Sequence, residues 1–335
     1  MGASIKAIEY VFPETKLTNK ELQECFPEYD FSKFENKVGI QTRYVVKNDE
    51  TALDLACKAV EKLISKGTVK DDIDYLLYCT QSPEYILPTT ACILQDRIGL
   101  SKNIGAFDFN LGCSGYTYGL SFAKALIASN QAKKVLLVTA ETYSKFIHEK
   151  DRTNRSIFGD AATATIIEKT EEDNIGNFSF GTDGKGYDKL IIKNGGSKHK
   201  YDANCKIKEY GTDNKYSDNH IYMNGPEIFN FTASAIPKFT KEVLEKNEVE
   251  KDDVSQFIFH QANAYMLNFM RKRVKVDSDK FYIDLKDGGN TVSNTIPIAL
   301  KNYSKSITKL ENIILVGFGV GLSWSGGLIK LDKEL

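Results

Sequence analysis

Ala106-Phe107-Asp108-Phe109-Asn110-Leu111-Gly112-Cys113-Ser114-Gly115-Tyr116 is the stretch from which we infer the fold. Phe107 and Phe109 alternate with polar residues, which predicts a short strand. The mostly apolar run 116–128 that follows is long enough for a buried helix. We therefore expect Cys113 at a strand-to-helix turn, where the free N–H groups of the helix start favour the thiolate. From this stretch alone, a buried structural cysteine is the alternative.

The composition indicates a globular protein. The chain has 335 residues, of which 41% are hydrophobic and 27% charged, and its formal net charge is -1. This balance does not suggest a partner such as nucleic acid. No apolar run reaches membrane-spanning length, and the first residues lack the pattern of a signal peptide, so we expect a cytoplasmic protein without a membrane partner. The six cysteines form no CxxC pair, which predicts free thiols and no metal site.

Strands and helices are predicted to alternate along the whole chain. Residues 18–21 (Thr-Asn-Lys-Glu) are typical of a helix cap. In the first half we expect strands at 5–10, 73–79, 107–109, 135–139 and 161–168, and helices at 50–65, 89–99 and 116–128. In the second half we expect strands at 257–259 and 281–285, and helices at 231–245 and 296–303.

The two halves resemble each other. Lys70-Asp71-Asp72-Ile73 returns as Lys251-Asp252-Asp253-Val254, and each is followed by an apolar strand. Phe158-Gly159 returns as Phe318-Gly319 in the same order. Coincidence among short matches is the alternative, but the shared order favours an internal duplication. We expect an α/β protein with halves 1–172 and 173–335, each with a mostly parallel sheet. The polar segment 193–219 between them is predicted to be a surface loop.

Two further residues could act with Cys113. His260 ends a predicted strand, at the sheet edge where α/β proteins place their sites. Asn290 lies in the strand–turn–helix unit that corresponds to the Cys113 unit, so the duplication places the two residues near each other. A core histidine and a simple turn asparagine are the alternatives. The other three histidines, in polar surroundings, are expected at the surface.

The glycine-rich segment Gly317-Phe318-Gly319-Val320-Gly321 does not fit a dinucleotide-binding loop, because Leu322 stands where the third glycine belongs. A backbone N–H donor is the more plausible role for this turn.

The order of these motifs resembles β-ketoacyl-acyl-carrier-protein synthase III, a family of the thiolase superfamily. The elements that carry the resemblance are Gly112-Cys113-Ser114-Gly115-Tyr116, Ile157-Phe158-Gly159-Asp160, His260-Gln261-Ala262-Asn263, Gly289-Asn290-Thr291, and Gly317-Phe318-Gly319 with Trp324. The resemblance implies the five-layered αβαβα thiolase fold, a homodimer, and a catalytic triad of Cys113, His260 and Asn290. It also implies an oxyanion hole made by the N–H groups of Cys113 and Gly319.

The implied reaction is a decarboxylative Claisen condensation. An acyl thioester of coenzyme A or of an acyl carrier protein would acylate the Cys113 thiolate. Malonyl-acyl-carrier-protein would then lose CO2, and its enolate would attack the acyl group. His260 and Asn290 would serve as hydrogen-bond donors to that enolate. This chemistry calls for no metal or other cofactor.

Several positions depart from the usual pattern of the family. Leu87 stands where an aromatic side chain often reaches into the partner's acyl pocket, which predicts room for longer or branched primers. Lys33 and Lys37 replace a tryptophan and an arginine that hold coenzyme A, and Tyr265 replaces an arginine. The resemblance implies substrate contacts at Leu87, Arg152, Phe158, Gly225, Ile228, Phe229, Asn263 and Lys37.

Four other functions are weaker alternatives. A papain-type protease shares the order Cys, His, Asn, but its tryptophan after the cysteine is replaced by Tyr116. A non-catalytic partner subunit would be expected to lack Cys113. Acyl transfer to a hydroxyl or an amine calls for a base at position 290. A condensation of the hydroxymethylglutaryl type calls for a glutamate base, for which only Glu84 lies near in the sequence.

Overall fold

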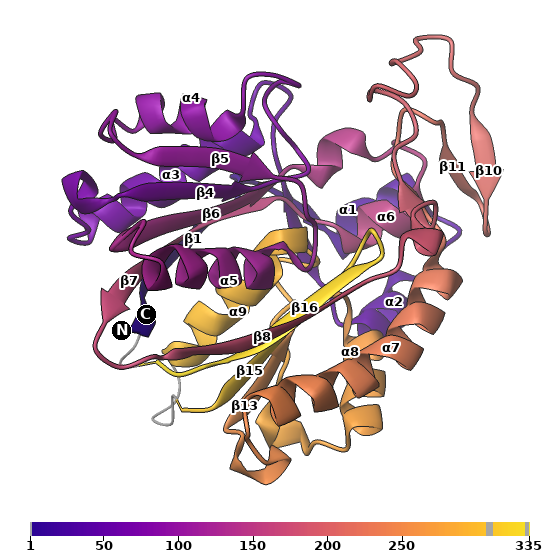
Figure 1. Cartoon of the computed structure of the whole chain (residues 1–335). Helices are drawn as coiled ribbons and strands as arrows, with labels where there is room; N and C mark the ends of the chain where they lie inside the picture. The colour runs from indigo at the N-terminus through magenta and orange to yellow at the C-terminus, as the bar shows by residue number, and fades with distance from the viewer. Residues whose placement is uncertain (1, 306–310, 332–334) are drawn as a thin grey trace.

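The computed structural model describes residues 2–305, 311–331 and 335. Two five-stranded sheets lie one above the other, with helices between them and on both outer faces, which makes five layers (Figure 1). This is the αβαβα arrangement that the family resemblance implies.

The first half supplies one sheet, of order β1-β7-β6-β4-β5. Its strands are β1 (Gly2–Val11), β4 (Tyr75–Cys79), β5 (Gly105–Phe109), β6 (Lys134–Glu141) and β7 (Ala161–Thr170). Its helices are α3 (Ala52–Ser65), α4 (Thr90–Arg97), α5 (Gly115–Ala128) and the short α6 (Arg152–Ile157). Buried residues recur along α3 at helical spacing and form an apolar face. This face, which includes Leu55, Ala59 and Leu63, packs against the outer side of the sheet.

The second half repeats the pattern. Its sheet has the order β8-β16-β15-β13-β14, with the same sequence of strand directions as the first. Its strands are β8 (Ile175–Thr182), β13 (Gln256–Phe259), β14 (Phe281–Tyr282), β15 (Ile313–Gly319) and β16 (Ser323–Ile329). Its helices are α7 (Gly225–Lys246), α8 (Ala264–Val274) and α9 (Thr295–Ser304). The equal topology of the sheets supports the predicted duplication, in which α5 corresponds to α9 and β5 to β14.

The middle layer joins the halves. Tyr116 and Leu120 of α5 and Ile296 and Leu300 of α9 are buried in one apolar cluster with residues of both sheets. Complete removal of such side chains from water contributes about 1.5–3 kcal/mol each, so these two helices hold the sheets together. Cys113 and Asn290 precede these helices, and the middle layer therefore places both residues between the sheets.

One prediction about the sheets is wrong. Each was expected to be mostly parallel, but two of the four strand pairs in each are antiparallel. Parallel neighbours need a crossover helix, whereas β15 returns directly as β16 through residues 320–322. Between β6 and β7 the chain forms a single 3-10 turn and the short helix α6, and it too returns antiparallel.

Several element ends differ from the prediction by a few residues, and side-chain hydrogen bonds explain two of these differences. The strand expected at 281–285 ends at Tyr282, because the Gln261 side chain takes the place of a strand partner: it accepts a hydrogen bond from Asp284 N (2.7 Å) and donates one to Phe259 O (2.6 Å). The helix expected at 231–245 begins at Gly225, where the Asn224 side chain caps it. The predicted cap at 18–21 is present as a reciprocal capping box between Thr18 and Glu21.

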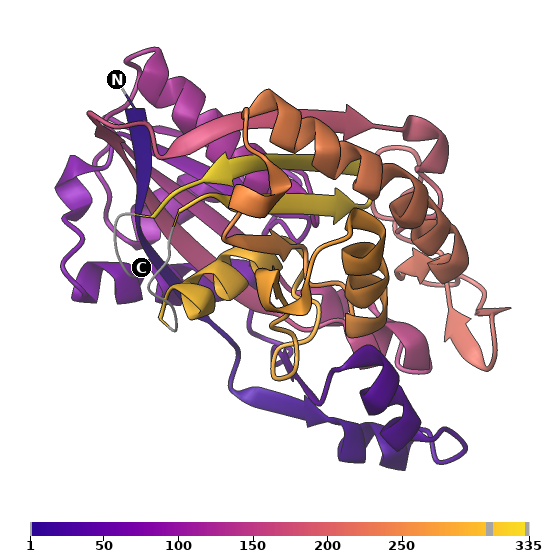
Figure 2. The ribbon, with the colours of Figure 1, turned by 90° about the horizontal axis from the view of Figure 1, so that it is seen from below.

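Two smaller parts lie outside the layers. The strands β2 (Thr15–Thr18) and β3 (Thr42–Val45), with α1 (Asn19–Cys25) and α2 (Phe31–Val38), form a lobe beside the second half (Figure 2). The segment 193–219 projects from the body and contains a hairpin of β10 (Lys208–Tyr210) and β11 (Asn214–Tyr216) (Figure 1). The short strands β9 (Leu190–Ile191) and β12 (Tyr222–Met223) pair at its base.

Two histidines are less exposed than predicted. His148 and His220 are both half-buried, and their rings pack at 4.9 Å between centroids beneath the projecting segment. His199 is exposed, as expected. Among the helices that the structure describes, none has the length and apolar character needed to cross a lipid bilayer.

Candidate active site

Cys113 lies between β5 and α5, two residues before the helix begins. Its side chain is buried, at 6% exposure, in an apolar cluster with Tyr143, Phe158 and Val292. The strand-to-helix turn predicted from the sequence is therefore present, and it places the sulfur inside the molecule.

The expected effect on the thiol is wrong in its net direction. The helix start was expected to favour the thiolate, but burial, together with the nearby carboxyl group of Glu141, raises the pKa of Cys113 to about 12. Removal from water disfavours the charged form more strongly than the N–H groups of the helix start favour it. Cys113 therefore needs a base to become nucleophilic.

Gly319, the last residue of β15, packs against Cys113. A Cβ atom at position 319 would lie 2.9 Å from the sulfur and 2.9 Å from the Cys113 Cβ. Atoms at that separation overlap, so only glycine lets the strand end approach the nucleophile. The backbone of Gly319 therefore lies in direct contact with the Cys113 side chain.

His260 follows β13 and is 2% exposed. Its backbone N–H donates to Val316 O (2.8 Å), which fixes the residue at the end of the sheet. The ring Nδ1 lies 2.7 Å from the Thr295 hydroxyl, and the ring packs edge-on against Phe318. Burial lowers the pKa of His260 to about 3, although a hydrogen bond to the backbone of Val292 opposes this effect. The imidazole is therefore neutral at physiological pH.

Asn290 lies in the turn between β14 and α9 and is 5% exposed. Its backbone pairs with the segment before β7, since Asn290 N donates to Ile157 O (2.9 Å) and Gly159 N donates to Asn290 O (3.0 Å). Its side-chain oxygen accepts a hydrogen bond from Val292 N (2.9 Å). Among the described residues, no hydrogen-bond partner is found for the amide N–H groups of Asn290.

Val292 connects the three residues. It shares the apolar cluster with Cys113, its N–H holds Asn290, and its backbone carbonyl lies beside His260 and Thr295. Its φ of +59° places a β-branched residue in the left-handed region, a conformation that costs about 1–3 kcal/mol. Such strain is concentrated at functional sites, where the surrounding structure holds it in place.

A cavity of about 210 Å3 adjoins the cysteine. Seven of the nine described residues that line it are apolar or aromatic, and Gln81, Asn110 and the Tyr143 hydroxyl supply polar groups. The Gln81 side chain accepts a hydrogen bond from Tyr143 (2.5 Å) and donates one to Asn110 (2.9 Å). A Cβ atom at Gly112 would touch Gln81 and Val320 of this lining, which places the cavity next to the nucleophile.

The loop that carries Leu87 is fixed at both ends. Gln81 N and the Ser82 hydroxyl donate to the carboxyl group of Glu141, and Thr90 N donates to Asp108. Between them, Tyr85, Ile86 and Leu87 are 60%, 88% and 79% exposed. The predicted contact residue Leu87 therefore lies at a firmly held, exposed apolar tip.

A second group of the predicted residues lines a separate cavity of about 510 Å3 between α2 and α6. It contains Lys37 and Arg152, and the Arg152 guanidinium stacks on the Tyr29 ring at 3.9 Å. Lys37 Nζ lies 4.9 Å from the centre of the Tyr265 ring. Tyr29 is the aromatic partner of Arg152, and the sequence motifs did not predict it. It stands four positions before Lys33, outside the expected pattern.

The remaining predicted contact residues do not lie together. Phe158 is buried beside Cys113, and Ile228 packs against the same cluster. Phe229 instead stacks on Tyr265, and Gly225 begins α7 with open space where a Cβ would lie. Asn263 caps α8, because its side-chain oxygen accepts a hydrogen bond from Met266 N (2.8 Å).

Glu141 is the buried acid of this region, not Glu84. It is fully buried at the end of β6, and burial raises its pKa to about 8. Glu84 lies in the exposed loop and hydrogen bonds to Thr90 through its backbone. The signal for Glu141 was available, since it ends a strand at the same sheet edge as the other site residues.

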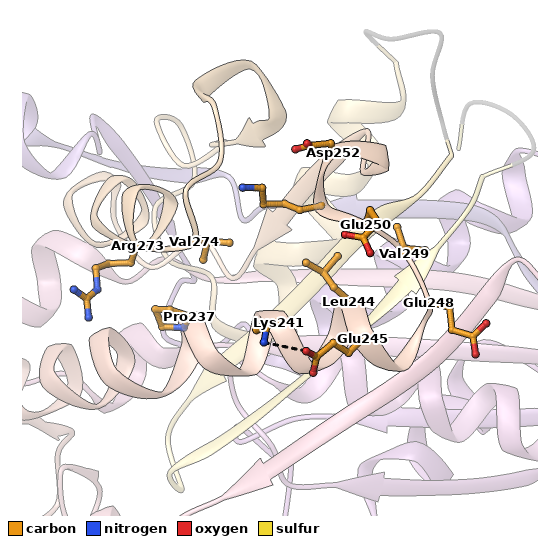
Figure 3. A pocket seen from close by; sticks show the side chains of 11 residues that line it. Pro237, Lys241, Leu244, Glu245, Glu248, Val249, Glu250, Asp252, Arg273 and Val274 are labelled. Carbon is orange, nitrogen blue, oxygen red and sulfur yellow. Dashed lines mark ion pairs between the residues drawn. The ribbon is translucent and has the colours of Figure 1, made fainter.

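A larger surface cavity, of about 770 Å3, lies elsewhere, between α7 and the end of α8 (Figure 3). Its lining carries both signs of charge, with an ion pair of 3.1 Å between Lys241 and Glu245. The described residues that line it are not shared with the Cys113 site, and none of them is a cysteine, a histidine or a serine.

Known proteins resemble this chain over nearly its whole length. Residues 107–184 match the family model of 3-oxoacyl-(acyl-carrier-protein) synthase III, and residues 244–331 match the model of its C-terminal part. A β-ketoacyl-(acyl-carrier-protein) synthase III of Clostridium perfringens is 38% identical over 95% of this chain and 96% of its own length. One of Clostridioides difficile is 34% identical over 98% of both chains.

Solved structures of the same family resemble this chain as well. A crystal structure of a 3-oxoacyl-(acyl-carrier-protein) synthase III has a TM-score of 0.96 and 41% identity, over 99% of this chain and 100% of that chain. A 3-oxoacyl-(acyl-carrier protein) synthase from Burkholderia xenovorans has a TM-score of 0.90 and 34% identity, over 99% of this chain and 94% of that chain. This chain therefore belongs to the 3-oxoacyl-(acyl-carrier-protein) synthase III family and is a condensing acyltransferase.

Proposed function

We propose that this enzyme joins an acyl primer to malonyl-acyl-carrier-protein through an acyl-Cys113 intermediate, with release of CO2. This is the initiating condensation of fatty acid biosynthesis. The observation that carries the proposal is the packing of Gly319 on Cys113, with His260 and Asn290 connected to the same cluster by Val292.

In the first half-reaction, Cys113 attacks the thioester carbonyl of the primer. Because its thiol has a raised pKa, a base must accept the proton, and His260 is the neutral imidazole of the site. The N–H groups of Cys113 and Gly319 would hold the oxyanion of the tetrahedral intermediate.

In the second half-reaction, the malonyl group loses CO2 and forms an enolate. Asn290 and His260 would donate hydrogen bonds to the enolate oxygen, which stabilises the charge as it develops. The enolate carbon then attacks the acyl-cysteine, and a β-ketoacyl product leaves. Thiol, imidazole and amide groups supply all of this chemistry, so we propose no resident metal or other cofactor.

The primer's acyl chain would occupy the cavity lined by Tyr143, Leu190 and Ile221. We propose that the enzyme is a homodimer in which the exposed tip with Leu87 closes the partner's cavity. Three consecutive exposed apolar residues on a loop fixed at both ends support this arrangement, since such a surface is stabilised by contact with a partner.

The cavity between α2 and α6 would receive coenzyme A. Lys33, Lys37 and Arg152 offer positive charge for phosphates, and Tyr29 offers an aromatic face. Malonyl-acyl-carrier-protein would reach the same entrance, where the exposed Tyr265 ring stacks on the half-buried Phe229. We propose that the protein works in the cytoplasm, where its six free cysteines stay reduced.

Acyl transfer to a hydroxyl or an amine is not favoured, because position 290 holds an amide rather than a base. The deciding experiment incubates the enzyme with acyl-coenzyme A and acyl-carrier-protein thioesters, one at a time, and measures its intact mass. A mass increase on Cys113, followed by CO2 and a β-ketoacyl product once malonyl-acyl-carrier-protein is added, supports the proposal. An enzyme that stays unmodified with every donor, or whose acyl group passes only to water, contradicts it.

A further inference from the structure

Thr295 occupies a position that controls where the proton of His260 lies. Its hydroxyl oxygen is 2.7 Å from His260 Nδ1 and 3.0 Å from the carbonyl oxygen of Val292. All three residues are at most 3% exposed, so no bulk water can replace a lost partner. A hydroxyl has a single hydrogen and can donate it to only one of these two atoms.

These two arrangements of the Thr295 hydroxyl form different numbers of hydrogen bonds. If Thr295 donates to Val292 O, its oxygen is free to accept a hydrogen bond from Nδ1–H, and two bonds form. If it donates to Nδ1, only that one bond forms, although Val292 O keeps the backbone N–H of Thr295. A buried polar group without a hydrogen-bond partner costs more free energy than one hydrogen bond contributes. The arrangement in which Thr295 donates to Val292 O and accepts from Nδ1–H is therefore the more stable one.

We propose that Thr295 is a positioning residue that keeps the His260 proton on Nδ1 and leaves Nε2 as the only ring nitrogen that exchanges a proton during the reaction. The catalytic role of this proton exchange rests on the proposed function. Nδ1 lies within hydrogen-bond distance of Thr295, and we assign the opposite ring nitrogen, Nε2, to Cys113 and the substrate.

The proton balance of the reaction follows from this placement. In acylation, the Cys113 thiol proton moves to Nε2, the sulfur bonds to the acyl carbon, and the donor's sulfur leaves as a thiolate that takes this proton from Nε2, which restores the neutral ring. In condensation, the bond to the departing CO2 breaks and its electron pair forms the enolate, while Nε2 takes a proton from water and donates it in a hydrogen bond to the enolate oxygen. The new carbon–carbon bond then forms, the Cys113 sulfur leaves as a thiolate, and it recovers the proton from Nε2.

Removal of the hydroxyl should therefore affect the two half-reactions unequally. In Thr295→Val the side chain keeps its shape, but Nδ1–H loses its nearest acceptor, and the tautomer with hydrogen on Nε2 gains population. That tautomer cannot accept the thiol proton, yet it can still donate to the enolate. We expect acylation of Cys113 to slow by about 10²-fold or more, the range that a positioned base contributes. Release of CO2 by enzyme that has been acylated to completion should change far less.

The experiment measures three quantities for the full-length enzyme. Intact mass against time gives the acylation rate, CO2 release gives the second half-reaction, and nitrogen-15 NMR of labelled histidine gives the His260 tautomer. The His260 signal is the one that His260→Ala removes. Thr295→Ser should restore the acylation rate and the Nδ1–H signal. Thr240→Val is the matched control, because Thr240 is also buried and donates to a helix carbonyl (Ile236 O, 2.8 Å) in α7.

The outcomes separate the inference from the proposed function. An Nε2–H signal in the wild-type enzyme overturns the inference, even if Thr295→Val does not fold. So does a Thr295→Val enzyme that acylates at the wild-type rate, or one that loses both half-reactions equally with the tautomer unchanged. A wild-type enzyme that no thioester acylates contradicts the proposed function instead, and the NMR signal still tests the tautomer.

Discussion

The backbone of Gly319 lies against the Cys113 side chain so closely that a Cβ at position 319 would come within 2.9 Å of the sulfur. Gly319 ends a strand of the second half, and Cys113 follows a strand of the first. Cys113 therefore lies at the contact between the duplicated halves, and neither half alone contains the site.

The first prediction uses this contact. Gly319→Ala should strongly slow acylation of Cys113, because the added methyl group must displace either the sulfur or the strand end. Loss of one oxyanion donor costs about 10²–10³ in rate, and displacement of the strand should cost at least that much. Acylation is followed by intact mass. Gly184→Ala is the control, since nothing lies within 4 Å of a Cβ at that position. Wild-type acylation of the Gly319 variant would show that the strand end plays no part.

Replacement of the nucleophile should remove the covalent intermediate but preserve the fold. Cys113→Ala should carry no acyl adduct and make no β-ketoacyl product, while its melting temperature stays near that of the wild type, because only one buried sulfur is lost. Cys57→Ala, which changes another buried cysteine, should still be acylated. An adduct that persists in the Cys113 variant would assign the nucleophile to another residue.

Asn290→Ala should slow the second half-reaction and spare the first, which is the opposite of the effect expected for Thr295→Val. Its amide serves the enolate, so acylation should proceed at close to the wild-type rate, while CO2 release falls by about 10²–10³-fold. Radiolabelled malonyl-acyl-carrier-protein measures that release. His260→Ala should impair both half-reactions, since it removes the base as well as a donor. Normal CO2 release from the Asn290 variant would refute this division of roles.

A buried ion cluster predicts how stability depends on pH. Glu9 is 2% exposed and lies within ion-pair distance of Lys62, Lys66 and Lys301. Burial alone would raise its pKa, but the hydrogen bonds to the three lysines outweigh burial and lower the pKa from 4.5 to about 2. A depressed carboxyl pKa stabilises the fold above the unfolded value, so this contribution is complete above pH 5 and is lost as the pH falls from about 5 towards 2.

Denaturant unfolding at several pH values tests this prediction. Each unit of pKa shift corresponds to about 1.4 kcal/mol, so Glu9 should contribute about 3 kcal/mol at pH 7. Glu9→Gln should lower the free energy of unfolding by about 3–5 kcal/mol and flatten its pH dependence below pH 5. Glu14→Gln removes an exposed ion pair with Lys47 and should have little effect. Equal behaviour of the two variants would contradict a role for the buried cluster.

Much of the fold could be predicted because the sequence repeats. The matching Lys-Asp-Asp turns and the two strand–glycine–helix units led to the prediction that Cys113 and Asn290 occupy corresponding positions in the two halves, and they do precede the corresponding helices α5 and α9. The hairpin return of β16 was not predicted, because an apolar run has the same pattern whether its neighbour is parallel or antiparallel.

The chemistry of the site was harder to predict than its residues. The raised pKa of Cys113 depends on burial between two sheets, which no local pattern contains. Thr295 and Val292 act through contacts with His260, a residue more than 30 positions away in the sequence. Tyr29 joins Arg152 only because the lobe of β2 and β3 folds beside α6. Each of these depends on tertiary contacts.

The last prediction concerns the size of the primer. Leu87 is 79% exposed on the tip that we propose closes the partner's acyl cavity, at a position where an aromatic ring is common in the family. Exchanging a ring for a leucine leaves room for about one to three methylenes, each worth about 0.8 kcal/mol when buried. The wild type should therefore use primers longer or more branched than acetyl, and Leu87→Phe should shift preference towards acetyl, with a loss that grows with chain length. Competition among acetyl, butyryl, isobutyryl and hexanoyl donors measures the shift, with Val69→Phe, an aromatic added at another exposed apolar position, as the control. If the Leu87 variant and the wild type share one profile, the tip does not enter the cavity, and residues within one chain, such as Tyr143 and Leu190, set its depth.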